Sequence, residues 1–291
     1  MLKNTVSKTR KLKNGVATTA VSLAFLIAVL PLVSVIYTTI SRGFARLDIE
    51  FFTYSMRGIV GEGGGILHAI VGTLLITLAA VIISVPVGIL TAVYLVEYSK
   101  PKAASAITFL VDVMSGIPSI VAGLFAYAVF ALILGPGTKL GIAGALALAL
   151  LMIPTVVRSS EEMLRLVPRD LREAALALGA PKWATVLKMV IPTALGGIVT
   201  GVLLGIARII GETAPLLIAA GFTASMNYNL FVDRMQSLPV YVYTQISNQG
   251  NPGWAFEDRA WSAALVLILI VLALNLVGRL IARFFGTKST R

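Results

Sequence analysis

Apolar runs alternate with short polar stretches along the whole chain. Six of these runs are long enough to cross a bilayer as helices, since about 20 apolar residues are needed, and the shortest is at the lower limit. The predicted spans are residues 16–40, 66–97, 104–134, 140–157, 192–220 and 261–285. The pattern therefore predicts an all-α polytopic membrane protein with six transmembrane helices across residues 16–285.

The composition supports a membrane protein. Only 13% of the residues are charged and 57% are hydrophobic, whereas a soluble domain carries about 25% charged residues. The chain has no cysteine and a single histidine, His68, which excludes disulfides, thiolate metal sites and His-rich metal sites. The first apolar run is too long for a signal peptide, and no small-residue cleavage site follows it.

The distribution of Lys and Arg predicts the orientation. Of the 24 Lys and Arg residues, we assign 17 to one side of the membrane, counting Arg279 and Arg283 at the end of the last span, six to the other side, and one, Arg208, to the inside of a span. Cytoplasmic segments are enriched in these cations. We therefore expect cytoplasmic N- and C-termini. The net charge of +11 follows from this topology and needs no nucleic-acid partner, and the inner face is attracted to anionic lipid. The inner segments include the tails 1–15 and 286–291 and the loop 158–191, and the outer loops are 41–65 and 221–260.

Neither outer loop carries a nucleotide site. The first contains a glycine cluster at 61–65, but it lacks the G-x-x-x-x-G-K-[ST] pattern, which is found nowhere in the chain. Any ATP hydrolysis must therefore belong to another polypeptide. The second loop is about 40 residues long, and loops of this length usually contain structure of their own, so we expect small helices there.

The predicted cytoplasmic loop contains an amphiphilic segment at 167–192. Pro168 can open a helix, and Gly179 can adopt the left-handed conformation that ends it. Pro181 can then open a second helix two residues later. Between these points the spacing predicts one apolar helix face, made of Leu171, Ala174, Ala175 and Leu178.

This segment resembles the EAA motif of permease subunits in bacterial ATP-binding-cassette importers. The matching residues are Glu173, Ala174, Ala175, Gly179 and the pair Ile191-Pro192. The resemblance implies a coupling helix that docks on the ATPase, carried here by Arg172, Glu173, Ala174, Ala175, Gly179, Ala180 and Pro181. The alternative from spacing alone is an amphipathic helix that rests on the membrane surface.

Charged residues inside the fifth predicted span are costly and therefore candidates for function. Arg208 and Glu212 are four residues apart, so they can pair on one face of a continuous helix, and Thr213 follows them. One interpretation is an anion-binding charge on a substrate pathway, with Glu212 neutralising it between substrates. The other is a structural ion pair between helices.

The third predicted span also contains polar residues, namely Asp112, Ser115 and Ser119. Gly116 and Pro118 can break the helix and free backbone N–H groups for an anion. The alternative is a packing kink, with Asp112 near the inner interface or bonded to Arg208 or another residue.

Together these residues resemble the phosphate-importer permeases of the PstA type. The most specific string is Gly211 to Leu217, GETAPLL. The resemblance implies a type I ABC importer permease fold in a bacterial cytoplasmic membrane, and a subunit that is not itself an enzyme. The implied partners are a PstC-like permease, two PstB-like ATPase subunits that hold ATP and Mg, and a PstS-like phosphate-binding protein. No cofactor is expected on this chain.

Four alternatives remain open at this point. The paralogous PstC-like subunit shares a similar Arg and Glu pattern, and a permease for another oxyanion would have the same architecture. An ion-coupled secondary carrier would use midplane charges and broken helices without an ATPase. A membrane scaffold would have no use for Arg208 and Glu212.

Overall fold

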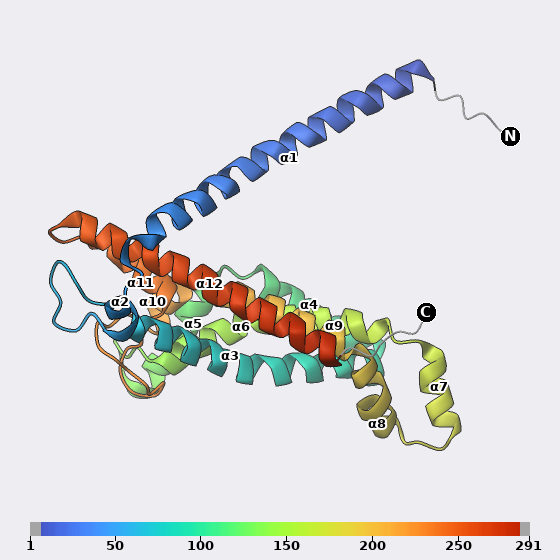
Figure 1. The fold of residues 1–291 in the computed structure, drawn as a ribbon. Helices are drawn as coiled ribbons and strands as arrows, with labels where there is room; N and C mark the ends of the chain where they lie inside the picture. The colour runs from blue at the N-terminus through green and yellow to red at the C-terminus, as the bar shows by residue number, and fades with distance from the viewer. Residues whose placement is uncertain (1–6, 286–291) are drawn as a thin grey trace.

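The computed structural model describes residues 7–285, and all regular structure in that range is helical (Figure 1). The helices are α1 (Lys8–Gly43), η1 (Phe44–Arg46), α2 (Ile49–Thr53), α3 (Leu67–Val93), η2 (Tyr94–Tyr98), α4 (Pro101–Gly116), α5 (Ser119–Leu134), α6 (Gly141–Arg165), α7 (Arg169–Ala177), α8 (Lys182–Thr185), η3 (Val186–Val190), α9 (Ile191–Ile209), α10 (Ala214–Ala219), α11 (Leu238–Ser247) and α12 (Gly253–Phe285). The predicted tail 286–291 and the first six residues of the tail 1–15 lie outside the described residues.

Five helical segments are long and apolar enough to cross a membrane, and a sixth candidate is a bent pair. The single segments are α1, α3 with η2, α6, α8 through α9, and α12. The bent pair is α4 and α5, whose axes meet at 103°. The chain is therefore a multi-pass membrane protein with an all-α fold, as predicted.

The bend between α4 and α5 follows from Pro118. A proline disfavours helical geometry in the preceding residue, and Ile117 is extended at φ −70° and ψ 128°. The predicted span 104–134 is thus two helices rather than one.

The fifth predicted span is also interrupted. α9 ends at Ile209, four non-helical residues follow, and α10 starts at Ala214 with Pro215 in its first turn. The N-terminal end of this span is longer than expected, because α8, η3 and α9 run on continuously from Lys182.

α6 lies at the centre of the bundle. Its buried face is rich in small residues, including Ala145, Ala147 and Ala149, which allow neighbouring helices to approach closely. α3, α5, α9 and α10 pack around it. A comparable close approach joins α5 to α10, where a Cβ added to Gly123 would lie 2.5 Å from the Cα of Pro215.

α1 projects away from the other helices and meets them near its C-terminal end (Figure 1). There Gly43 lies against α12, and a Cβ on Gly43 would be 2.7 Å from that of Leu265. None of the most apolar 18-residue window of α1 is buried. Most of this helix therefore has no packing partner within the described chain.

The two ends of the bundle differ in structure. α7 and α8 lie at one end, and α2 and α11 lie at the other (Figure 1). The carboxylate of Asp48 caps α2 by accepting from the backbone N–H of Phe51 at 2.7 Å. α11 is the small helix expected in the loop 221–260, whereas α12 starts inside that loop, at Gly253.

Candidate functional site

α6 brings together polar residues from two neighbouring helices. Thr155 and Arg158 are three residues apart on α6, so they lie on the same helix face. Arg158 forms an ion pair with Asp112 of α4. Arg208 of α9 donates through Nη1 to the Thr155 hydroxyl at 3.5 Å. The structure thus places Asp112 and Arg208, both predicted site residues, beside one face of α6.

This face is open in the single chain. The side chain of Asp112 is 60% exposed, and Arg208 is also exposed. Among the described residues, Arg208 forms no ion pair, whereas Arg158 is paired with Asp112 and lies 3.4 Å from Glu161. A positive charge without a carboxylate partner therefore remains on Arg208.

Arg158 was not predicted as a site residue. The predicted span ended at 157, but α6 continues to Arg165, so Arg158 stays on the same helix as Thr155. The spacing of three between Thr155 and Arg158 could have indicated a shared helix face. That spacing is informative only if one helix contains both residues, and the predicted span ended between them.

Arg208 and Glu212 could pair on a continuous helix, but they do not pair in this structure. Their spacing of four requires a continuous helix, but α9 ends at Ile209 and Glu212 lies in the turn that follows. No ion pair joins the two side chains in the described part of the chain. Gly211 disfavours helix, and Pro215 has no backbone N–H to donate to the carbonyl of residue 211, so a continuous helix is not formed.

The other predicted polar residues surround the two helix breaks. Thr213 directly precedes α10, and Ser119 is the first residue of α5. The hydroxyl of Ser115 donates to the Val111 carbonyl at 3.0 Å, so its hydrogen bond is made within its own helix.

One side of the bend is apolar, and one of its backbone amides is already bonded. The backbone N–H of Ile117 donates to the Met114 carbonyl at 3.3 Å, so this amide is not free. The adjacent cavity, about 260 Å³, is lined by apolar side chains that include Phe125 and Leu151. An anion gains nothing from such a lining.

The predicted turn of the coupling segment is confirmed. Gly179 has φ +80°, in the left-handed region. Its N–H donates to the Leu176 carbonyl at 3.0 Å, and the N–H of Ala180 donates to the Ala175 carbonyl at 3.1 Å. These bonds end α7. Pro168 directly precedes α7 rather than occupying its first position, and Pro181 likewise directly precedes α8.

Arg172 anchors this segment to the bundle. Its Nε donates to Oε1 of Glu97 at 2.9 Å, and its Nη1 and Nη2 donate to the carbonyls of Val167 and Leu164 at 2.6 and 2.8 Å. The side chains of Arg172 and Glu97 are only 18% and 8% exposed. Arg172 is therefore a positioning residue that holds α7 in place.

The predicted apolar face of α7 is not packed against the rest of the chain. Within it only Ala175 is buried, whereas Leu178 is 88% exposed. Trp183 and Leu187, which follow on α8 and η3, are also exposed. These residues form an uncovered apolar surface at the end of the bundle. Glu173, Ala174 and Pro181 are exposed beside it, and Ala180 is half-buried.

A buried arginine organises the opposite end. Arg259 of α12 is fully buried, and its Nη1 donates to the carbonyls of Gly61 and Gly63 at 2.5 and 3.2 Å. Its Nε donates to the side chain of Gln245 at 3.0 Å. The glycine cluster thus offers carbonyl oxygens to a cation. Burial also raises the pKa of the nearby Tyr241 hydroxyl, which stays protonated.

In the described residues no group of three or more His, Cys, Asp or Glu is placed to hold a metal.

Residues 84–291 match the family described as the binding-protein-dependent transport system inner membrane component. This chain belongs to that family. The permease is 46% identical over 97% of its length to the phosphate transport system permease protein PstA 1 of Mycobacterium tuberculosis strain H37Rv, covering 91% of that protein. It is 40% identical over 99% of its length to the phosphate transport system permease protein PstA of Pasteurella multocida strain Pm70, covering all of that protein.

Solved structures confirm the fold. The permease is similar to a chain of a bacterial ABC transporter that imports alginate, with TM-score 0.68, 14% identity, and coverage of 96% of this chain and 99% of that chain. It is also similar to a chain of the MetNI methionine ABC transporter, with TM-score 0.59, 20% identity, and coverage of 77% and 95%. The permease therefore has the fold of ABC importer transmembrane subunits. It works with other importer subunits and a binding protein, and the ATPase is a separate subunit.

Proposed function

We propose that this permease moves inorganic phosphate across a bacterial cytoplasmic membrane as the PstA-type subunit of an ATP-driven importer. The observation that carries the proposal is the exposed Arg208, a positive charge without a carboxylate partner among the described residues, beside Thr155 and the Asp112–Arg158 pair. The names of the similar PstA proteins support phosphate as the substrate.

The chemistry of Arg208 fits this role. A multiply charged anion that enters a low-dielectric span needs a positive partner to offset its desolvation. A guanidinium offers a planar fork of donors that matches phosphate oxygens. Because Asp112 is engaged by Arg158, it leaves Arg208 available for a substrate.

The open face implies a second permease subunit, for which we propose a PstC-like chain. Asp112 and Arg208 are exposed in the single chain, and charged groups at membrane depth require protein or water around them. The long unpacked part of α1 supports the same proposal, since its apolar surface is available to lipid or to a neighbouring subunit.

The uncovered apolar surface around Leu178 and Trp183 supports docking of an ATPase. We propose one PstB-like subunit on each permease, with ATP and Mg bound there, and a PstS-like binding protein on the outer loops. This arrangement assigns α7 and α8, with both termini, to the cytoplasm, in agreement with the distribution of Lys and Arg.

The test is uptake by proteoliposomes that contain the permease with candidate PstC-, PstB- and PstS-like partners. We expect radiolabelled phosphate uptake that requires ATP and every partner, and that excess sulfate does not suppress. ATP-dependent uptake of sulfate or another oxyanion in place of phosphate would identify a permease for that anion. No ATP-dependent uptake of any oxyanion by a fully assembled complex would contradict the proposal.

A further inference from the structure

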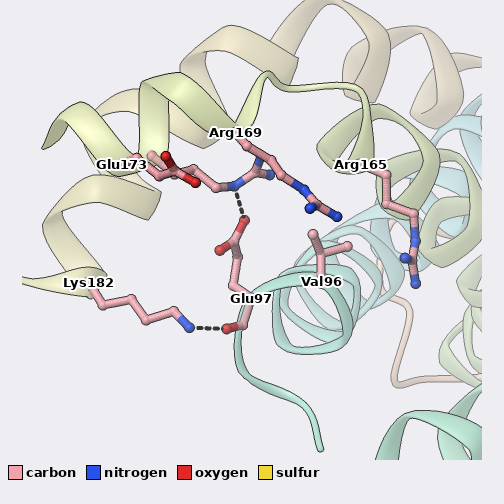
Figure 2. Close-up of a pocket in the computed structure, with 7 residues that line it drawn as sticks. Val96, Glu97, Arg165, Arg169, Glu173 and Lys182 are labelled. Carbon is pink, nitrogen blue, oxygen red and sulfur yellow. Dashed lines mark hydrogen bonds and ion pairs between the residues drawn. The ribbon is translucent and has the colours of Figure 1, made fainter. Parts of the chain in front are cut away.

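A cavity of about 440 Å³ lies between the coupling segment and the bundle. Its walls come from four elements, namely the end of α6, α7, η2 and α8. Figure 2 shows Arg169 extending towards Val96, with Arg165 beside them on a different element. The lining residues are Val96, Glu97, Arg165, Arg169, Arg172, Glu173 and Lys182.

The lining has four cationic side chains and two carboxylates, so it carries excess positive charge. Two of the cations are already satisfied. The guanidinium of Arg172 already donates hydrogen bonds to Glu97 and to two backbone carbonyls. Lys182 donates to the Glu97 carbonyl and lies over the Tyr98 ring, 4.9 Å from its centroid.

The remaining two cations are not fully neutralised. Arg165 is bonded to Glu161 at 2.8 Å, but Glu161 also lies 3.4 Å from Arg158 and so is shared between two arginines. Arg169 has no hydrogen bond or ion pair to any described residue through its side chain. Across the lining, four cationic side chains face two carboxylates, Glu97 and Glu173, so the cavity keeps excess positive charge.

We propose that this cavity binds a phosphate group, held by Arg169 and Arg165. Guanidinium forks pair with phosphate oxygens, often with two hydrogen bonds each. The volume is in the range of small-ligand sites, about 300–1,000 Å³, so it accommodates a phosphate with a substituent as well as a free one. The group can come from inorganic phosphate on the cytoplasmic side or from an anionic phospholipid headgroup, since the cavity lies beside the inner end of α3.

The site is separate from the proposed substrate pathway. None of its lining residues is Asp112, Arg158 or Arg208, and α7 lies beyond the ends of the spanning helices (Figure 1). Binding here would join the end of α6 to α7, because Arg165 and Arg169 belong to those two helices. A bound ligand would therefore stabilise the junction between α6 and α7, which Arg172 also holds in place. This inference does not depend on phosphate being the transported substrate.

The test uses the full-length purified permease in two settings. In detergent, inorganic phosphate is titrated by calorimetry. In nanodiscs of phosphatidylcholine with or without phosphatidylglycerol, native mass spectrometry counts retained anionic lipid. Both measurements are made in an Arg208→Gln background, which removes the other candidate anion site.

Three variants distinguish binding in the cavity from nonspecific attraction of anions to the positive surface. Arg169→Gln should weaken binding about tenfold, because one charge-assisted contact is worth about that factor. Glu173→Gln should strengthen binding, since it removes a negative charge from the lining. Lys188→Gln is the matched control: it removes the same charge from exposed η3, outside the cavity, and should change nothing.

The two settings distinguish the source of the phosphate group. Binding of inorganic phosphate that Arg169→Gln weakens and Lys188→Gln spares supports a site for the free anion. Selective loss of retained phosphatidylglycerol in Arg169→Gln supports a lipid headgroup site. Equal effects of Arg169→Gln and Lys188→Gln, or no binding in either setting, would overturn the proposal.

Discussion

Arg172 and Glu97 are 75 residues apart in the sequence, and their side chains meet at 2.9 Å between Nε and Oε1. The bond joins α7 to η2 at the inner end of the second spanning segment. The same guanidinium also binds the carbonyl of Leu164, in the last turn of α6, and that of Val167, just beyond it. A displacement of α7 by a docked partner would therefore be transmitted directly to two helices of the bundle.

The first prediction concerns this anchor. Arg172→Lys keeps the charge, but an ammonium on a single stem cannot reach three divergent acceptors in the way a guanidinium does. We expect a loss of roughly 1–3 kcal/mol in local stability and faster amide hydrogen exchange in α7. Arg169→Lys is the matched control on the same helix and should leave exchange unchanged. Equal protection in both variants would show that Arg172 does not anchor α7.

The second prediction concerns the turn at Gly179. No atom lies within 4 Å of a Cβ built there, so a substitution is opposed only by its φ of +80°. Gly179→Val should cost about 1–2 kcal/mol or more in backbone strain, while the protein remains inserted. We expect weaker retention of the ATPase in pull-down experiments and less stimulation of its hydrolysis. Gly179→Asn tolerates the left-handed region better and should retain more of both. Unchanged coupling in Gly179→Val would exclude this turn as a docking element.

The sequence predicted features that depend on local backbone chemistry. Gly179 and Pro118 act through steric rules that hold in any context, so the left-handed turn and the break of the third span could both be anticipated. The sequence alone could not decide whether Arg208 pairs with Glu212, because the pairing depends on where α9 ends. The Asp112–Arg158 pair joins helices that are distant in sequence, and its geometry is set by the packing of α4 on α6. The fully buried Arg259 was equally hidden, since its position in the sequence suggested an ordinary outer-loop cation.

The third prediction concerns Arg259. Its removal would leave the buried carbonyl of Gly61 and the half-buried carbonyl of Gly63 without this donor, and unsatisfied buried groups are costly. Arg259→Gln should destabilise the permease by roughly 2–4 kcal/mol, seen as a lower melting temperature and faster proteolysis of the loop around residue 61. Arg57→Gln removes an exposed arginine from the same outer loop and should be neutral. A stable Arg259→Gln variant would show that another group supports the loop.

The fourth prediction concerns topology. The chain has no native cysteine, so a single introduced thiol reports one position. A cysteine at Asn248, which is exposed at the end of α11, should react with a membrane-impermeant reagent in whole cells. A cysteine at Leu178, which is 88% exposed in the coupling segment, should react only after the cells are opened. The reverse pattern would invert the proposed orientation.

The fifth prediction separates the two interpretations of Arg208. If it provides a required positive charge, Arg208→Gln should lose most phosphate uptake, and Arg208→Lys should retain part of it, because the charge remains but the donor fork is lost. Because Arg208 and Glu212 do not pair in the structure, the double variant Arg208→Gln/Glu212→Gln should be as inactive as Arg208→Gln alone. Uptake restored in the double variant would instead indicate a structural pair that forms in another state of the transporter.

The contact with Thr155 allows a finer test of the same site. Thr155→Val removes the hydroxyl that accepts from Arg208 at 3.5 Å while keeping the side-chain shape. The guanidinium would remain charged but less well positioned, so we expect a partial loss of uptake, smaller than in Arg208→Gln. Thr200→Val is the matched control on α9, because its hydroxyl bonds only to its own helix, at the Gly196 carbonyl. Each value is normalised to the amount of assembled complex, so misassembly is not counted as lost transport. Full uptake by assembled Arg208→Gln would rule out a required charge at this position, whatever the result for Thr155→Val.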